Sequence, residues 1–415
     1  GAVEAVRIGN FGEIRADAAT SLAMVITELC QNAVEHGLDG GAGRIEVRPD
    51  TSAEGMVIDV VDDGTGLPDG FRLGNQNTIF IGGGTPSLLE ETCITDLLEN
   101  IKHEFYVEAD AEVSIETNPG TLTKEKLAAY GDAAINRISI GVQSLSDNIL
   151  DIIGRLHSAE EAEKCYELTR EAGFQNINLD TMFALPGQDM TVWRDTVEKV
   201  IKMRPEHISF YSMQLEENSK FYNRYKYNCM EIPDDKLERG MHHAAIEMLE
   251  SAGYIHYEIS NATLLGYECR HNLKYWSMQE YLGMGLGAHS YIEDAEETEN
   301  DIVRLGVRCN NTNDLNEYIK NVNENNLPVD LKSVKKDTVS DAMSIYIFTA
   351  LRTKRGIDFA DFRNKFGKDF YQVYNCEVNA LKNEIKAGLI ECGKNFFHLT
   401  EKGIDRSNDI MAEFV

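Results

Sequence analysis

The alternation of apolar and polar positions divides this chain into two regions with different rhythms. Between Asp17 and Leu38, apolar side chains recur every three or four positions, which predicts an amphipathic helix. The next two apolar stretches, Arg44–Arg48 and Met56–Val61, are typical of paired strands. From Thr78 onwards, short apolar strands alternate with loops and helices, and that order predicts a parallel sheet or barrel.

Polar clusters follow the C-terminal ends of the strands in this second region, where barrel enzymes carry their sites. The predicted strands are Thr78–Ile81, Glu112–Glu116, Arg137–Val142, Asn176–Phe183 and His207–Met213. The first two connecting helices are expected over Ser87–His103 and Lys124–Gly131.

Helical periodicity returns near the C-terminus after a polar, Asn-rich stretch. Helices are predicted at Ser340–Arg352, Phe359–Phe366 and Tyr371–Gly388, with a small hairpin formed by Leu389–Ile390 and Phe397–Thr400. Helices with a two-stranded wing indicate a winged-helix-like module. Its acidity argues against DNA binding, so we expect it to cover a substrate or to contact a partner.

Composition changes at the boundary between the two regions. Residues 1–76 contain no lysine and no tyrosine, although the chain has 17 tyrosines. We call residues 74–78, where the two regions meet, the joint. The net charge of −29 disfavours nucleic acid and anionic membrane surfaces as partners of the whole chain.

The eight cysteines are scattered, and no CxxC or CxxxCxxC motif occurs, so no local zinc or iron–sulfur ligand set is predicted. Scattered cysteines without a secretory leader pattern favour a cytoplasmic location. No apolar run reaches the ~20 residues that span a bilayer.

Polar and glycine positions in the first region could surround a nucleotide. Glu28 and Asn32 lie four positions apart on one helix face, where they could orient a water and Mg²⁺. Asp62 can accept an adenine amino hydrogen, and Gly64 and Gly66 let the backbone approach a base. An exposed helix face and an ordinary Asp- and Gly-rich turn are the alternative interpretation.

In this order, ELCQNAVEHG and DDGTGLP resemble the nucleotide-binding domain of bacterial sensor histidine kinases, a branch of the Bergerat-type ATPases. The resemblance implies that Glu28, Asn32 and Asp62 lie at ATP and its magnesium ion. The second glycine-rich box of that family is missing, because Gly70–Gly74 leads directly into the joint. We therefore expect weak ATP binding at most and no autokinase activity, since phosphate contacts carry much of the affinity.

The second region has its own candidate groups. Gly82-Gly83-Gly84 can expose backbone amides to an amino-acid group, and Arg155 can pair with a carboxylate. Asp180, at a strand end, can accept two ribose hydroxyls. Each group also has an ordinary interpretation: a turn, a surface ion pair and a helix cap, with Glu116 as a solvated strand end.

The full set of motifs is more specific than its members. TIFIGGGTPSLL, SIETNPGTL, NRISIGVQSL, NLDTMFALPGQ and ECRHNLKYW, in this order, resemble oxygen-independent coproporphyrinogen III oxidase-like radical-SAM proteins. HNLKYW and the later GAHSY are most similar to the haem-chaperone branch of that family. The resemblance covers residues 77–415 and implies an incomplete (β/α)6 barrel that binds S-adenosylmethionine and handles porphyrin or haem.

The resemblance also implies residue roles. The methionine part of S-adenosylmethionine would contact Gly83, Gly84 and Thr85. The same cofactor would be lined by Glu116, Gln143 and Arg155, and its ribose would be held by Asp180. His271 and His289 would bound the porphyrin or haem site, and a hydrogen-bonded structural role is the alternative for each histidine.

One departure bears on activity. The family has a first strand and a CxxxCxxC loop that holds a [4Fe–4S] cluster, and the ATPase-like region occupies their place here. Without these ligands we expect no resident metal and no radical chemistry. The loss also leaves Thr78–Ile81 as an unpaired edge, and we hypothesise that strand Met56–Val61 pairs there instead.

The predicted fold class is therefore α/β: a partial radical-SAM barrel with a winged-helix-like module, preceded by an incomplete Bergerat-type ATPase fragment. The expected domains are residues 1–76, 77–295, a connector at 296–335, and 336–415. Four functions remain open: an enzyme acting on a porphyrinogen, a haem-binding or haem-delivering protein, an ATP-binding sensor fragment, and an inactive fusion of two truncated genes.

Overall fold

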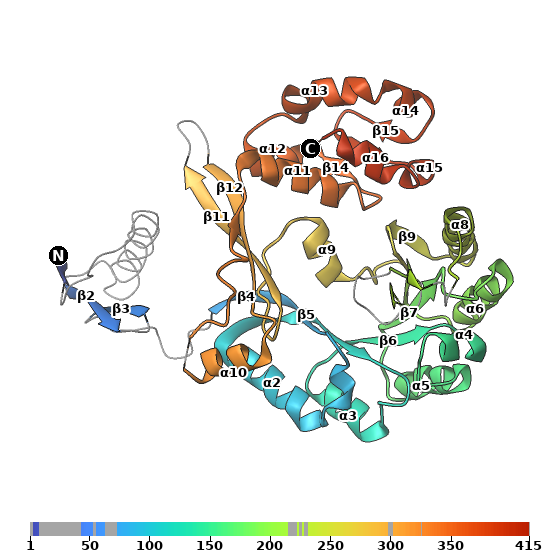
Figure 1. Ribbon diagram of the computed structural model, residues 1–415, viewed down its shortest axis with the longest axis horizontal. Helices are drawn as coiled ribbons and strands as arrows, with labels where there is room; N and C mark the ends of the chain where they lie inside the picture. Colours follow the sequence, from blue (N-terminus) through green and yellow to red (C-terminus); the bar gives the residue numbers. More distant parts are fainter. Residues whose placement is uncertain are drawn as a thin grey trace. The chain divides into compact units, whose positions relative to one another are not determined.

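The computed structural model describes residues 3–7, 43–52, 55–62, 73–214, 222–223, 226–227, 231–297, 302–324 and 326–414. They separate into two compact units. The smaller unit holds Gly1–Asn75 with Asn100–Tyr106, and the larger unit holds Gln76–Glu99 with Val107–Val415. Figure 1 draws both units.

The first region contains a three-stranded sheet in the order β1-β2-β3. Its strands are β1 (Val3–Arg7), β2 (Gly43–Ser52) and β3 (Gly55–Asp62). Strand β1 pairs with β2 in parallel, and β2 pairs with β3 as an antiparallel hairpin. The pairing of the two predicted strands is therefore confirmed.

The hypothesis that residues 56–61 complete the barrel edge is wrong. Strand β3 belongs to the small sheet, whereas the barrel's first strand, β4 (Leu73–Ile81), belongs to another sheet. Only two residues connect β2 to β3. Closing that short loop costs less conformational entropy than pairing with a more distant strand, so the hairpin forms instead.

The larger unit is built on a curved seven-stranded sheet, a half-barrel with the strand order β4-β5-β6-β7-β8-β10-β9. Strands β5 to β8 pair in parallel, whereas β10 pairs antiparallel with both β8 and β9. After β4 the strands are β5 (Phe105–Thr117), β6 (Arg137–Gln143), β7 (Ile177–Phe183), β8 (His207–Ser212), β9 (Ile255–Glu258) and β10 (Asn261–Thr263).

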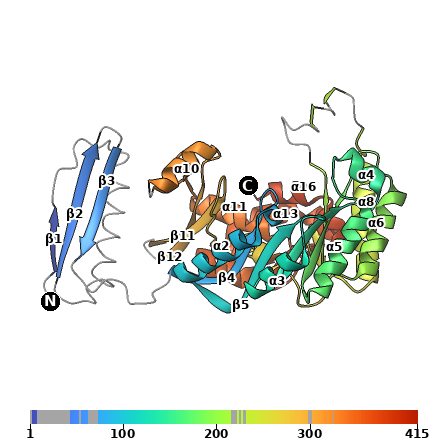
Figure 2. The same cartoon turned by 90° about the horizontal axis from the view of Figure 1, so that it is seen from below.

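Helices cover one side of this sheet, as Figures 1 and 2 show. They are α2 (Glu91–Glu104), α3 (Lys124–Asp132), α4 (Asp147–Ile152), α5 (Ala159–Glu171), α6 (Met190–Met203) and α8 (Asp235–Ser251). Strand β6 is buried at all seven positions, as expected for a central parallel strand. The main core lies between this sheet and its helices and includes Leu98, Ile140, Leu179 and Trp193.

Helix α9 (Arg270–Trp276) carries the HNLKYW residues. The stretch predicted as a connector contains more structure than expected. It holds most of an antiparallel hairpin between β11 (His289–Glu297) and β12 (Ile302–Asn310), followed by α10 (Leu315–Asn323) and β13 (Lys335–Lys336). The hairpin is rich in polar residues and lacks long apolar runs, so this strand pairing was not predicted from the sequence.

The C-terminal module packs around a second core, to which Met278, Tyr291 and Leu305 of the preceding segment also contribute, and it has a three-stranded sheet in the order β14-β16-β15. Its helices are α11 (Val339–Ala350), α12 (Phe359–Phe366), α13 (Phe370–Ala380), α14 (Lys382–Lys386), α15 (Glu401–Ile404) and α16 (Ser407–Ala412). Its strands are β14 (Ile357–Asp358), β15 (Ile390–Cys392) and β16 (Phe396–Leu399). Among the described residues, no helix has the length and apolar character to cross a membrane.

Candidate functional site

A glycine loop follows strand β4 at the C-terminal edge of the half-barrel. Gly83 and Gly84 both have positive φ, +82° and +60°, which favours glycine over residues with a Cβ. The backbone N–H of Gly83 donates to the Glu116 carboxylate at 3.1 Å, and Asn118 donates to the Thr85 hydroxyl at 3.0 Å. The loop is therefore held against the end of β5.

Side chains from neighbouring strand ends converge on Gly141 of β6. A Cβ at this glycine would lie 2.7 Å from Asn118 Oδ1, 3.0 Å from Gln143 Nε2 and 3.4 Å from Arg155 Nη2. Tyr211 of β8 donates to Gln143 Oε1 at 3.1 Å. Only a residue without a side chain leaves this space open at the centre of the cluster.

The electrostatics of this cluster depend on its partial burial. Burial raises the pKa of Glu116, the Gly83 N–H opposes that rise, and the nearby Asp180 adds to it. Burial lowers the pKa of Arg155, while Tyr211 and Asp180 oppose the change. Two carboxylates and one guanidinium thus face one polar space, which suits a ligand that carries both a positive and a negative group.

Asp180 of β7 is held by two donors. Ser139 Oγ donates to Asp180 Oδ2 at 2.7 Å, and Asn178 Nδ2 donates to Oδ1 at 2.8 Å. Asn178 Oδ1 in turn accepts from His207 Nδ1 at 2.7 Å. A carboxylate fixed by two short hydrogen bonds still has lone pairs for hydroxyl donors from a ligand.

The N-terminus of α9 is held by a buried carboxylate on β5. Glu112 accepts from the backbone N–H of Arg270 at 3.2 Å and of His271 at 3.1 Å, and from Cys269 Sγ at 3.6 Å. Free N–H groups at a helix start attract negative charge, so Glu112 fixes the position of α9 against the sheet.

His271 is bonded through both ring nitrogens. Nδ1 lies 2.9 Å from Thr78 Oγ1 and Nε2 lies 2.9 Å from the Tyr275 hydroxyl. The ring also stacks on Phe80 at 5.2 Å between centroids. Burial lowers the pKa of His271 to about 4, and Lys274 contributes to the same direction. The imidazole is therefore neutral near pH 7, as a metal-ligating histidine must be.

Helix α9 also reaches the C-terminal module. The Arg352 guanidinium lies 5.7 Å from the Trp276 ring centroid, a cation–π contact. Backbone bonds join the same parts, from Ile259 N–H to the Arg352 carbonyl and from Lys354 N–H to the Tyr257 carbonyl, each 3.0 Å. The two parts of the larger unit are thus joined by both main-chain and side-chain contacts.

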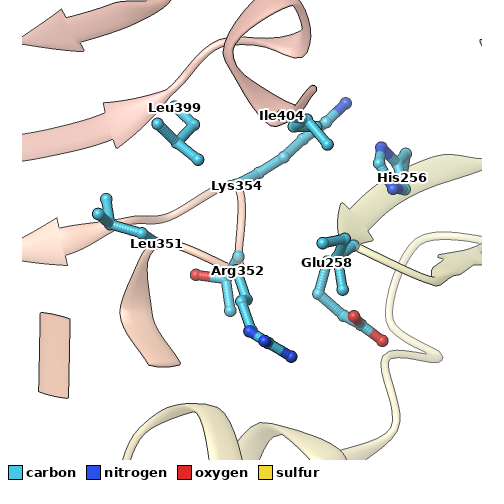
Figure 3. Close-up of a pocket in the computed structure, with 9 residues that line it drawn as sticks. His256, Glu258, Leu351, Arg352, Lys354, Leu399 and Ile404 are labelled. Carbon is cyan, nitrogen blue, oxygen red and sulfur yellow. The ribbon is translucent and has the colours of Figure 1, made fainter. Parts of the chain in front are cut away.

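A small cavity lies at this junction, and Figure 3 shows the residues that surround it. Its volume is about 20 Å³, enough for one water molecule. His256, Glu258, Arg352 and Lys354 supply its polar groups. Among the residues that the structure describes, neither ring nitrogen of His256 nor Nε of Arg352 has a hydrogen-bond partner, so a bound water would satisfy atoms that are otherwise costly to bury.

The structure brings several sequence-predicted residues together and leaves others apart. Glu116, Gln143, Arg155 and Asp180 face one space beside the loop that carries Gly83, Gly84 and Thr85. His289 begins β11 as an exposed residue opposite Asn310, and no contact joins it to His271 among those described. Glu28, Asn32, Gly64 and Gly66 lie outside the described residues, and Asp62 is the last residue of β3.

Sequence reasoning missed the polar residues that hold the side chains of the site and the start of α9 in place. They are Glu112, Asn118, Ser139, Asn178, His207, Tyr211 and Tyr257. The available signal was the alternation of Asn178 and Asp180 in β7, and of His207, Ser209 and Tyr211 in β8, which places those side chains on one sheet face. A buried strand with one polar face indicates a binding site on the inner face of the sheet.

These features define a class of protein: a half-barrel with a cluster of polar side chains at the C-terminal strand ends and an attached helical module. The radical SAM superfamily model matches residues 67–200, and the HemN C-terminal domain model matches residues 338–406. The model of histidine kinase-, DNA gyrase B-, and HSP90-like ATPases matches residues 17–84, which overlaps the radical SAM match across the joint.

Relatives narrow the class to a family. Heme chaperone HemW of Lactococcus lactis is 33% identical over 346 residues, covering 83% of this chain and 86% of the relative. Heme chaperone HemW of Bacillus subtilis is 32% identical over 352 residues, covering 85% and 87%. The chain belongs to the HemW family of radical-SAM proteins.

Solved structures agree on the fold. Coproporphyrinogen III oxidase (HemN) from Escherichia coli, a radical SAM enzyme, superposes with a TM-score of 0.67 at 21% identity, covering 82% of this chain and 78% of that chain. The half-barrel and helical module expected from the motifs are thereby confirmed.

Proposed function

We propose that this chain binds S-adenosylmethionine and haem or a porphyrin, and that it does so without carrying out radical chemistry. The observation that carries the first part is the convergence of Gln143 and Arg155 on Gly141, with Glu116 and Asp180 close by. This space lies beside the open glycine loop at the strand ends, where α/β enzymes bind their ligands.

The residues present fit S-adenosylmethionine. Gly83 and Gly84 have open space where side chains would stand, so backbone can approach the methionine part. Arg155 would pair with the ligand carboxylate, Glu116 with its ammonium group, and Asp180 with the ribose hydroxyls. When bound, the cofactor supplies a sulfonium whose reductive cleavage needs an electron donor.

The chain does not fit a [4Fe–4S] cluster. Its 415 residues contain no CxxxCxxC motif, and the cysteine on the first helix of the half-barrel, Cys93, is separate from the others. Across the residues with described structure, no three His, Cys, Asp or Glu side chains are placed to hold a metal ion. We therefore derive no electron-transfer step and no radical for this chain.

Haem binding is proposed at α9. The relatives are named heme chaperones, and α9 presents a neutral imidazole, His271, beside Tyr275 and Trp276. Its two ring nitrogens are already hydrogen bonded, so iron coordination requires that Thr78 or Tyr275 release one of them. Tyr275 is the easier to displace because it is 38% exposed, whereas Thr78 is buried.

Two titrations test the proposal. Calorimetry with S-adenosylmethionine should show binding that Asp180→Asn weakens and that Asp195→Asn, an exposed change on α6, leaves unaltered. Haemin should give a shifted Soret band that His271→Ala removes and His243→Ala, an exposed change on α8, preserves. Absence of S-adenosylmethionine binding, or a Soret shift unaffected by His271→Ala, contradicts the corresponding half of the proposal.

Anaerobic reconstitution with iron and sulfide tests the absence of radical chemistry. The proposal expects no stoichiometric [4Fe–4S] absorption, and such a cluster would overturn it. Mg-ATP titration tests a second candidate, weak nucleotide binding by the first region, which the match of the ATPase model to residues 17–84 supports. Reading the gene across the codons of the joint would test whether the chain is a fusion of two truncated genes.

A further inference from the structure

A chain of buried hydrogen bonds runs through the polar face of the half-barrel. From Asp180 it passes to Asn178 at 2.8 Å, to His207 at 2.7 Å, and from His207 Nε2 to the Tyr257 hydroxyl at 2.9 Å. The Tyr257 oxygen then accepts from the backbone N–H of Cys269 at 3.2 Å. The chain therefore joins the candidate ribose-binding carboxylate to the residue that precedes α9.

In every hydrogen bond of this series, the donor is on the side of Cys269 and the acceptor is on the side of Asp180. The Asn178 amide must point its NH₂ group at the carboxylate, so its oxygen faces His207 and His207 Nδ1 carries a proton. His207 Nε2 is then an acceptor, which requires the Tyr257 hydroxyl to donate. Burial lowers the pKa of His207 well below its ordinary value, which agrees with this neutral tautomer.

The strength of these hydrogen bonds depends on what binds at either end of the series. Asn178, His207 and Tyr257 are 3%, 1% and 8% exposed, so water competes little with their hydrogen bonds. In a low-dielectric interior, aligned hydrogen bonds polarise one another and gain strength together. A new hydrogen-bond donor on the Asp180 carboxylate would therefore weaken the hydrogen bond from the Cys269 N–H to Tyr257. Cys269 lies two residues before His271.

Building on the proposed function, we propose that His207 and Tyr257 are positioning residues that couple S-adenosylmethionine binding at Asp180 to the placement of α9. Ribose hydroxyls that donate to Asp180 compete with Asn178 for the same charge. The bonds behind Asn178 weaken in turn, and the Cys269 end of α9 loosens while Glu112 continues to hold Arg270 and His271. Cofactor occupancy is thereby transmitted to the helix that carries the haem candidate.

Tyr257→Phe tests this coupling, because it removes only the hydroxyl that joins His207 to Cys269. Tyr254→Phe is the matched control: Tyr254 is also buried, at 3% exposure, and donates to the Pro205 carbonyl at 2.7 Å, outside this chain of hydrogen bonds. Both changes leave one buried acceptor without its donor, and Tyr257→Phe also leaves the Cys269 N–H without its acceptor, so the two variants are compared by a ligand-induced shift in folded protein and not by their stability. A difference in response between the two variants therefore reports on the chain of hydrogen bonds and not on a general loss of stability.

The readout is fluorine NMR of full-length protein labelled with 5-fluorotryptophan. The chain has two tryptophans, and Trp276 lies at the end of α9, so Trp276→Phe assigns its resonance. In wild type and Y254F, S-adenosylmethionine should move the Trp276 resonance with the dissociation constant found by calorimetry. In Y257F the ligand should still bind, about fivefold more tightly because Asp180 loses a polarised competitor, and the Trp276 resonance should stay in place.

Each outcome decides between the ideas. A Trp276 shift in Y257F equal to that in Y254F, or no shift in wild type that binds the ligand, overturns the coupling and leaves the proposed function intact. No binding to wild type overturns both. If Y257F fails to fold, His207→Asn replaces it with the same expectations, because its shorter amide does not reach both Asn178 and Tyr257.

Discussion

Glu258 makes the stability of the half-barrel depend on pH in an unusual direction. Its side chain is 2% exposed, accepts from the Asn261 amide and from the Ser260 N–H at 3.1 Å, and lies beside Arg352 at the junction cavity. Burial raises its pKa from 4.5 to about 7, although the Ser260 N–H and Arg352 both oppose the rise. The folded protein therefore retains a proton that the unfolded chain has lost.

The sign and magnitude follow from that difference. Between pH 4.5 and about 7 the folded state binds more protons at this group, so the free energy of unfolding falls as pH rises. A rise in pKa from 4.5 to about 7 corresponds to about 3 kcal/mol, lost progressively across this window and constant above it. Glu258→Gln keeps an amide oxygen as acceptor and removes the titration.

The assay is chemical unfolding of wild type and Glu258→Gln at several pH values from 5 to 8, followed by circular dichroism. We expect the difference in unfolding free energy to grow in favour of the variant by about 2.5 kcal/mol over this range, because part of the total change already lies below pH 5. Glu250→Gln is the control, because Glu250 contacts Lys354 at the same junction but is partly exposed. Parallel profiles for wild type and Glu258→Gln would refute the reasoning.

Three further predictions concern the two candidate sites. Tyr275→Phe removes the hydroxyl that is hydrogen bonded to His271 Nε2, so haemin should bind roughly 2- to 10-fold more tightly in a Soret titration. This gain corresponds to the loss of a competing hydrogen bond worth about 0.5–1.5 kcal/mol. Weaker binding would argue against coordination through Nε2. Glu112→Gln leaves α9 without its charged acceptor, at a cost of about 1–3 kcal/mol, and amide exchange at its first residues should accelerate; unchanged protection would contradict this role. Gly141→Ala places a methyl group 2.7 Å from Asn118 Oδ1, so the affinity for S-adenosylmethionine measured by calorimetry should fall. The melting temperature reports any folding defect separately. Undiminished affinity would show that the ligand does not bind beside Gly141.

The sequence predicted the parallel strands well because their apolar runs are long and their turns are marked by glycine and proline. Strand β6 was expected over Arg137–Val142 and extends one residue further, and α12 begins and ends where periodicity placed it. Strands β9 and β10 were not predicted, because four and three residues are too short to show a period.

The candidate site was only half accessible to sequence reasoning. Gly83, Asp180 and their neighbours belong to local motifs, so their positions could be read in order along the chain. The bond from His207 to Asn178 depends on the register of β7 against β8, which places Asn178 directly opposite His207. That register and the docking of α9 on Glu112, 159 positions from His271, are set by packing and not by a local pattern.

The junction between the half-barrel and the C-terminal module has a consequence for protein engineering. Its two backbone bonds, from Ile259 to Arg352 and from Lys354 to Tyr257, place few demands on side-chain identity beyond the exclusion of proline at the two donor positions. A C-terminal module from a distant relative could therefore be grafted before α11, the first helix of the module, with the connection preserved. Chimeras made at this point would separate the contribution of the module from that of the half-barrel within one scaffold.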